Sequence, residues 1–175
     1  MVSSGIIRRV DELGRIVIPK EIRRKLHIKN GDNLEILVND DNIILKKYSV
    51  IDNISNVIDS YANAFHNVLR YNVFITDTDK IITVSGNLRN KYLNLNISSS
   101  IEKIIDRREK YCSNKRCSIE ISPGLIEDGY YVTSPIICNG DVLGAVIILS
   151  SDNPMLPGDE KMAYILSDIL CNYFV

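Results

Sequence analysis

The sequence has few of the residues from which metal sites and many catalytic sites are built. Of its 175 residues, two are histidine and four are cysteine. His27 and His66 lie far apart and lack the neighbours of a catalytic triad or a metal site. Cys112 and Cys117 are close together, but a structural zinc site commonly needs a second close pair, which the sequence does not contain. We therefore expect no metal site, no catalytic residues and no cofactor.

Glycine-rich phosphate loops and long apolar runs are absent as well. No stretch has the glycine spacing of a P-loop or a dinucleotide-binding loop, which argues against an enzyme of either class. No apolar run approaches the roughly 20 residues that span a bilayer, and residues 1–9 lack the apolar core of a signal peptide. We expect a cytoplasmic chain without a membrane partner, with reduced cysteines. Cys138 and Cys171 have apolar neighbours, so we expect both to be small buried side chains.

Charge is divided unevenly along the chain, although the net charge is only −1. Residues 1–50 hold ten Lys or Arg against seven Asp or Glu, whereas the remaining 125 residues hold eleven against fifteen. The imbalance is sharpest over residues 8–29, where eight basic side chains stand against three acidic ones. Such a cluster can be an ordinary solvated face, and it can also be the electrostatic footprint of nucleic-acid binding. Charge alone leaves both interpretations open.

The first fifty residues have the pattern ββαββ. Residues 5–10 and 15–18 are expected to be strands joined by a turn at residues 11–14. Pro19 ends the second strand and suits the first position of a short basic helix, expected over residues 20–26. A hairpin turn at residues 40–42 is expected to join strands at residues 34–38 and 43–48. So small a domain buries little core alone and leaves sheet edges exposed, and we therefore expect it to dimerise.

Residues 5–26 carry a specific motif, which includes Asp-Glu-Leu-Gly-Arg-Ile-Val-Ile-Pro at positions 11–19. Together with the segment from Asp32 to Tyr48, it resembles the AbrB-type transition-state regulators over the whole basic part of the chain. The resemblance implies a swapped-hairpin barrel, in which two chains interleave their strands. It also implies binding to double-stranded DNA. We accordingly assign residues 1–50 to a DNA-binding and dimerisation domain.

The resemblance further implies which side chains contact DNA. The matching positions are all arginine in this chain, namely Arg8, Arg15, Arg23 and Arg24, and Arg9 and Lys20 are additional candidates. A guanidinium group offers a planar fork of donors to a phosphate or to the edge of guanine. The alternative for each residue is a surface arginine paired with a nearby carboxylate, such as Arg15 with Asp11 or Glu12. Because attraction to phosphates is largely independent of sequence, we expect broad, shape-sensitive recognition of DNA.

From Ser49 onwards the pattern becomes that of an α/β (α+β) domain. Apolar side chains recur at helical spacing over residues 51–70, which predicts an amphipathic linker helix. Residues 71–175 are assigned to the second domain. Its expected strands are residues 72–76, 80–84, 130–138 and 142–149, and its expected helices are residues 97–110 and 159–174. These helices are expected to pack on a largely antiparallel sheet.

The segment at residues 130–149 resembles the central hairpin of a GAF domain. With the leading domain, it makes the chain similar to sporulation regulators that join these two modules. The resemblance implies an activator or repressor of sporulation-stage genes, and we expect it to assemble with itself as a homodimer or homotetramer. A GAF-like domain implies either an oligomerisation role or a small-molecule effector, whose binding residues we do not assign. The signature of cyclic-nucleotide GAF domains is absent, because the only phenylalanine after Asn90-Lys91 is Phe174.

Some swapped-hairpin proteins are antitoxins, and this gives an alternative function. Antitoxins of this kind bind a toxin protein through a short, disordered carboxy-terminal tail. Here the carboxy-terminal part has its own apolar pattern and a closing helix, which favours a regulator with a sensing or oligomerising domain. The alternative is an antitoxin-like protein whose carboxy-terminal domain binds a protein partner.

Overall fold

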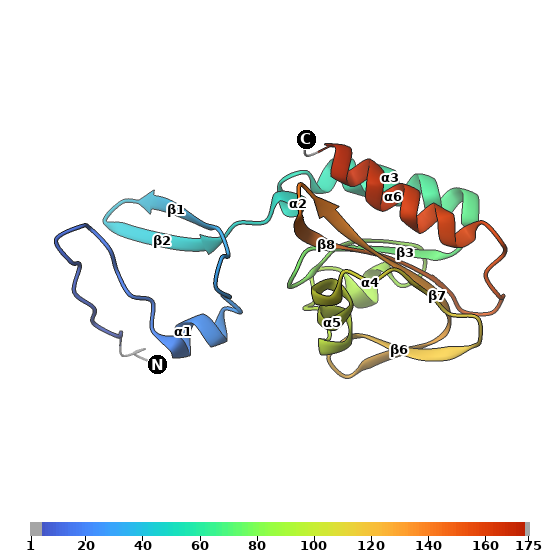
Figure 1. Cartoon of the computed structure of the whole chain (residues 1–175), viewed down its shortest axis with the longest axis horizontal. Coiled ribbons are helices and arrows are strands. Elements are labelled where there is room, and N and C mark those ends of the chain that lie inside the picture. Colours follow the sequence, from blue (N-terminus) through green and yellow to red (C-terminus); the bar gives the residue numbers. More distant parts are fainter. Residues whose placement is uncertain (1–4, 174–175) are drawn as a thin grey trace. The chain divides into compact units, whose positions relative to one another are not determined.

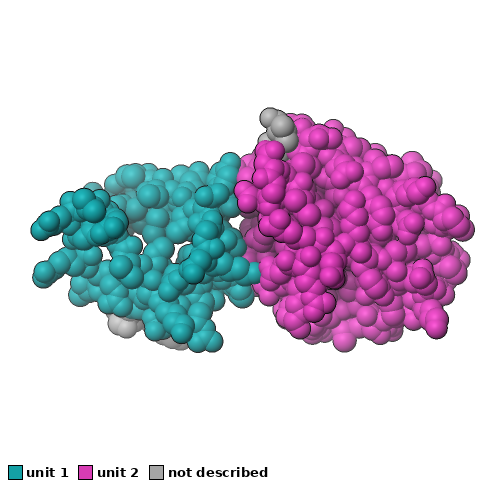
Figure 2. Space-filling model, viewed as in Figure 1, with its two compact units in different colours: residues 1–48 teal, residues 49–175 magenta. Residues whose placement is uncertain are grey.

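The computed structural model describes residues 5–173. They belong to two compact units, unit 1 (residues 1–48) and unit 2 (residues 49–175), which Figure 2 shows in teal and magenta. Within the described residues, no helix is long and apolar enough to cross a membrane. The closing helix expected over residues 159–174 is present over Asp159–Tyr173, and Phe174 lies outside the described residues.

Unit 1 consists of a short helix and a β-hairpin (Figure 1). The helix α1 (Lys20–Lys25) has Pro19 as its N-cap residue, and the Pro19 carbonyl accepts a hydrogen bond from the Arg23 amide at 3.0 Å. Strands β1 (Leu34–Asn39) and β2 (Asn42–Lys47) pair in an antiparallel register that brings Asn39 opposite Asn42. The helix and the hairpin therefore lie close to their expected positions.

The two strands expected at residues 5–10 and 15–18 do not form in the single chain. Between them the turn is present, because the Asp11 carbonyl accepts from the Gly14 amide at 3.0 Å and the Asp11 amide donates to the Arg15 carbonyl at 3.1 Å. A strand exists only where its backbone groups find a partner strand. Within the described residues of one chain, this segment has none, so it is extended and is followed by α1, β1 and β2. The ββαββ pattern was expected of a dimer, and a single chain does not test the pairing of its first two strands.

Unit 1 has almost no hydrophobic core. Among its described residues, only Pro19 is buried. Apolar side chains of the extended segment face solvent, with Ile7 91% and Val17 76% exposed, and Val38 on the hairpin is 77% exposed. A domain that leaves its apolar side chains in water on this scale lacks the main driving force for folding. What it needs is a second surface against which to bury them.

Unit 2 is built on an antiparallel sheet of six strands. The strands are β3 (Asn72–Thr76), β4 (Ile81–Ser85), β5 (Tyr111–Cys112), β6 (Cys117–Ser122), β7 (Leu125–Cys138) and β8 (Asp141–Ser150). Their order is β4-β3-β8-β7-β5, and β6 pairs with the first part of β7. The expected hairpin is the β7–β8 pair, whose turn residues Asn139 and Gly140 both have positive φ, as the tightest hairpin turns require.

Helices cover both faces of this sheet (Figure 1). On one side lie α2 (Val50–Asn53), α3 (Ser55–Leu69) and α6 (Asp159–Tyr173), and on the other lie α4 (Arg89–Tyr92) and α5 (Ser99–Arg107). Alternation along the strands divides the core accordingly. Val73 and Ile75 of β3 pack with the α3 and α6 side, whereas Phe74 between them packs with Tyr92 and the α5 side. The strands are thus apolar on both faces, as expected for a sheet that has helices packed on each face.

Several details of unit 2 differ from the sequence-based expectation. The helix expected over residues 51–70 is divided at Ile54 into α2 and α3, and Ile58 and Ala62 of α3 are completely buried in the unit 2 core. The helix expected over residues 97–110 is shorter, because the Ser98 side chain caps its start by accepting from the Ile101 amide at 3.2 Å and Arg108 ends it in the left-handed conformation. Helix α4 and strands β5 and β6 were not expected, and β7 begins at Leu125, before the expected start at residue 130.

Candidate nucleic-acid interface

All six side chains predicted to contact DNA lie in unit 1. Five of them are exposed and Arg23 is half-buried; the exposed ones are Arg8, Arg9, Arg15, Lys20 and Arg24. Lys20, Arg23 and Arg24 share the short helix α1. The other three lie on the extended segment before it, which pairs with no strand of its own chain within the described residues. The structure therefore gathers three of the predicted residues on one element and leaves three on another.

Arg15 is held by the turn that precedes it. Its Nε donates to Asp11 Oδ2 at 2.7 Å, and its backbone amide donates to Asp11 Oδ1 at 2.8 Å. The Leu13 amide adds a third bond to Asp11 Oδ1 at 3.0 Å. These hydrogen bonds, led by that of the Arg15 backbone, lower the pKa of the Asp11 carboxyl from its usual value. Of the two acidic partners considered from the sequence, the structure thus pairs Arg15 with Asp11.

The Arg15–Asp11 pair leaves most of the guanidinium available. The side chains are 72% and 42% exposed, so the pair is screened by water and stabilises the unit little. A guanidinium has five N–H donors, and Asp11 takes only the one on Nε. The two amino groups of Arg15 can therefore still meet a phosphate while the turn fixes the direction of the side chain.

Arg23 is held from the loop that follows α1. Its Nη1 donates to Asn30 Oδ1 at 3.3 Å, and its buried Nε has no hydrogen-bond partner among the described residues. Asp32 closes the same loop by accepting from the Lys29 amide at 2.7 Å and pairing with Lys47 Nζ at 3.1 Å. Asn30 was missed by sequence reasoning, since a single asparagine in a loop carries no periodic signal.

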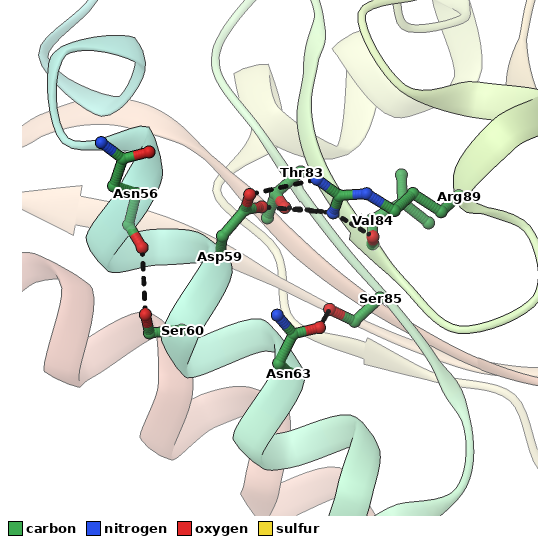
Figure 3. A network of polar contacts seen from close by, with 8 residues as sticks. All are labelled: Asn56, Asp59, Ser60, Asn63, Thr83, Val84, Ser85 and Arg89. Carbon is green, nitrogen blue, oxygen red and sulfur yellow. Dashed lines mark hydrogen bonds and ion pairs between the residues drawn. The ribbon is translucent and has the colours of Figure 1, made fainter.

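A separate polar network in unit 2 is structural (Figure 3). The Arg89 guanidinium forms two bonds to the Asp59 carboxylate, at 3.3 and 3.1 Å, and Nη1 also donates to the Val84 carbonyl at 2.8 Å. Beside it, the Ser85 hydroxyl donates to Asn63 Oδ1 at 2.6 Å. These contacts join α3 to β4 and to the start of α4. Their donors and acceptors satisfy one another, so the network holds the edge of the sheet in place.

The cysteines of the described chain form no metal cluster and no disulfide. Cys138 is buried as expected, and burial, followed by the hydrogen bond of the Cys171 thiol, raises the pKa of Cys138 to about 12. Cys171 is half-buried. The surface concavities of unit 2 include one of about 510 Å³ at the end of α3 and one of about 220 Å³ beside Cys112.

Two family models match the chain. Residues 53–172 match the model described as "Stage V sporulation protein T C-terminal, transcription factor". Residues 7–52 match the model described as "Antidote-toxin recognition MazE, bacterial antitoxin". The boundary between the two matches lies close to the boundary between unit 1 and unit 2.

One relative matches nearly the whole chain, and another matches unit 1. The chain is 45% identical over 163 residues to stage V sporulation protein T of Bacillus subtilis (strain 168), covering 92% of each protein. It is 65% identical over 48 residues to the transition state regulatory protein AbrB of the same organism, which is 27% of this chain and 50% of AbrB. Among solved structures, the GAF domain from a phosphoenolpyruvate-protein phosphotransferase of Coxiella burnetii has a TM-score of 0.53, with 14% identity over 89% of each chain. The last likeness concerns the fold alone and agrees with the GAF-like arrangement expected from the hairpin.

Proposed function

The chain belongs to the stage V sporulation protein T family, and from this membership we infer that it regulates transcription of sporulation genes by binding double-stranded DNA through unit 1. The family model for unit 2 describes a transcription factor, and identity to the full-length relative spans both units. The observation that carries the proposal is the basic segment at residues 8–29, whose arginines except the half-buried Arg23 are exposed on a unit with almost no core of its own.

We assign DNA contacts to Arg8, Arg15, Arg23 and Arg24, with Arg9 and Lys20 as secondary contacts. Exposed guanidinium groups suit phosphates, because each offers paired donors and keeps its charge at every physiological pH. Arg15 and Arg23 are each oriented by a neighbouring oxygen, which reduces the conformational freedom that binding would otherwise remove. Such contacts favour affinity over strict sequence readout.

We propose that unit 1 is completed by a second copy of the chain. The extended segment at residues 5–18 has exposed apolar side chains and no strand partner of its own, and the β1–β2 hairpin is exposed on both faces. Interleaving two copies would pair the free backbone groups and bury the apolar side chains together. Residues 1–50 would then be one DNA-binding and dimerising domain, with both sets of arginines on the assembly.

Further assembly would use the GAF-like domain, which we assign to residues 71–175, together with the linker helix at residues 51–70, and both lie in unit 2. Val68 of α3 and Ile165 of α6 are exposed on helices that lie side by side over one face of the sheet (Figure 1). A second pair of such helices would cover them, and two kinds of dimer contact in one chain give a homotetramer. The same unit offers a concavity of about 510 Å³ for a small-molecule effector. We infer a cytoplasmic, non-enzymatic protein, because a transcription factor acts where the chromosome is.

The test is binding of the full chain to labelled duplex DNA, followed by fluorescence anisotropy over a range of salt concentrations. We expect saturable binding, and we expect the log of the affinity to fall linearly with the log of the salt concentration. Absence of binding by a folded, assembled protein at low salt would contradict the proposal.

The antitoxin alternative rests on the description of the family model that matches residues 7–52. It predicts a stable complex with a small toxin protein that unit 2 holds. Co-expression with the products of neighbouring genes, followed by affinity purification, separates the two functions. A stoichiometric complex that neutralises a growth-inhibiting protein would favour the antitoxin, whereas DNA binding without such a partner favours the regulator.

A further inference from the structure

Unit 2 carries a basic segment within an otherwise acidic surface. Residues 49–175 contain eleven Lys or Arg, and six of these fall within residues 103–116. That segment, which we call the basic edge, holds only two carboxylates, whereas the rest of unit 2 holds five Lys or Arg against thirteen Asp or Glu. The cations of the basic edge are Lys103, Arg107, Arg108, Lys110, Lys115 and Arg116. The excess of cations is therefore confined to this segment and is not a general property of unit 2.

The basic edge follows the outer strand of the sheet. It begins in α5, passes Arg108 in the left-handed conformation that ends the helix, and includes β5, which pairs with β7 through Cys112 and Val132. It then leads into β6. Two known effects explain parts of it: a cation in the last turn of α5 suits the helix dipole, and charges on an edge strand discourage aggregation. Neither effect accounts for six cations beside a strand of two residues.

These cations are exposed and largely uncompensated. All six side chains face solvent. Among the described residues, no ion pair involves Lys103, Arg107, Arg108, Lys115 or Arg116, and Lys110 Nζ lies 4.5 Å from the centre of the Tyr164 ring. Of the five cations elsewhere in unit 2, three are each paired with a carboxylate, namely Lys80, Arg89 and Lys91. The basic edge therefore keeps its charge free for a partner outside the unit.

We propose that the basic edge is a second DNA-binding surface, which contacts phosphates of the duplex that unit 1 holds. This inference rests on the proposed function. Unit 2 follows unit 1 directly at Ser49, so DNA bound by unit 1 is present at high effective concentration around unit 2. Tyr111 is the one large apolar side chain exposed on the basic edge, and a single such residue does not make the apolar centre that protein interfaces have. Phosphates, which need only charge and donors, fit this surface better than an acidic protein does.

The experiment compares two charge-matched variants of the full chain. The test variant is Arg107→Gln with Arg116→Gln, and the control variant is Arg70→Gln with Lys161→Gln, which removes two exposed cations elsewhere in unit 2. Binding to labelled duplex is measured from low to moderate salt. Each lost phosphate contact makes the slope of log affinity against log salt shallower by about 0.9. The test variant is therefore expected to have a slope shallower by about 1.8 for each chain bound. The control variant is expected to keep the slope of the wild type.

The outcomes separate this inference from the proposed function. If the wild type binds DNA and the test variant keeps its slope and affinity, or if the control loses as much as the test variant, the basic edge is not a DNA contact. A test variant that binds DNA normally but fails to regulate a reporter gene indicates an acidic protein partner and overturns the inference as well. If the wild type itself binds no DNA, the proposed function fails first.

Folding and charge are checked by two further measurements. Thermal unfolding of both variants should match the wild type, because exposed cations without partners contribute little to stability. The variant Arg107→Lys with Arg116→Lys, which keeps both charges, should restore the wild-type slope. A lysine variant as defective as the glutamine variant would mean that guanidinium geometry or local structure, and not phosphate charge, was being measured.

Discussion

Arg23 and Arg15 differ in how firmly the protein holds them. Arg23 is half-buried and reaches Asn30 from α1, whereas Arg15 stands in solvent on a turn organised by Asp11. Sequence could identify both as candidates because the motif places arginine at both positions. It could not identify Asn30 or choose between Asp11 and Glu12, since those contacts depend on how the loop closes in three dimensions.

We predict that Arg23→Ala and Arg15→Ala both weaken DNA binding without unfolding the chain. A contact with a base edge is worth roughly 1–3 kcal/mol and would relax sequence preference, whereas a phosphate contact would make the salt slope shallower by about 0.9. Titration of duplex DNA at several salt concentrations distinguishes the two. Lys161→Ala is the control, since Lys161 lies in unit 2 and outside both the unit 1 arginines and residues 103–116. Unchanged binding by both arginine variants would mean that the interface has been assigned to the wrong residues.

Asp11 provides a test of the turn by titration. Its pKa is lowered from 3.8 because the folded turn stabilises the charged carboxylate. A lowered pKa means that the contribution of the group is fully present above 3.8 and disappears as pH falls through the folded value. We expect the Arg15 amide resonance to titrate with a midpoint below 3.8, and the midpoint to rise in Arg15→Ala. A midpoint at or above 3.8 in the wild type would contradict the observed hydrogen bonds.

At the scale of elements, the sequence was most informative where the signal is local. Helical spacing predicted α6, and the Asn139-Gly140 pair predicted the β7–β8 turn, because both depend on neighbouring residues. Strand β6 was missed although Ile119 and Ile121 alternate and are buried, since a short strand in a polar region gives a weak signal. The strands expected before α1 are absent in the single chain because their pairing needs another segment.

The approach of β8 to β3 depends on one glycine. A Cβ on Gly144 would collide with the Thr76 carbonyl oxygen of the neighbouring strand. We expect Gly144→Ala to destabilise unit 2 by about 1–3 kcal/mol, because backbone atoms must move apart to admit the methyl group. Thermal or urea unfolding measures the loss. Gly5→Ala, where nothing lies within reach of the added carbon and φ is not positive, is the matched control and should leave unit 2 unchanged.

At the scale of the whole molecule, the proposed assembly makes a prediction about the molecular mass in solution. Light scattering of the full chain at micromolar concentration should give at least a dimer, and a tetramer if unit 2 also pairs. Val68→Asp with Ile165→Asp should reduce a tetramer to a dimer that still binds DNA. Ile126→Asp, which places the same charge on another exposed apolar residue, is the control. A monomer mass for the wild type would refute both proposed contacts.

The lack of a core in unit 1 has a consequence for how the cell would control such a protein. If the DNA-binding fold is completed only when two chains meet, folding of that unit is a bimolecular reaction, and its extent depends on how much protein has been made. At low abundance most chains would be incompletely folded in unit 1, and doubling the supply would more than double the number of competent molecules. The number of molecules able to bind DNA would then rise steeply above a threshold amount of protein, whatever the effector or target sequence.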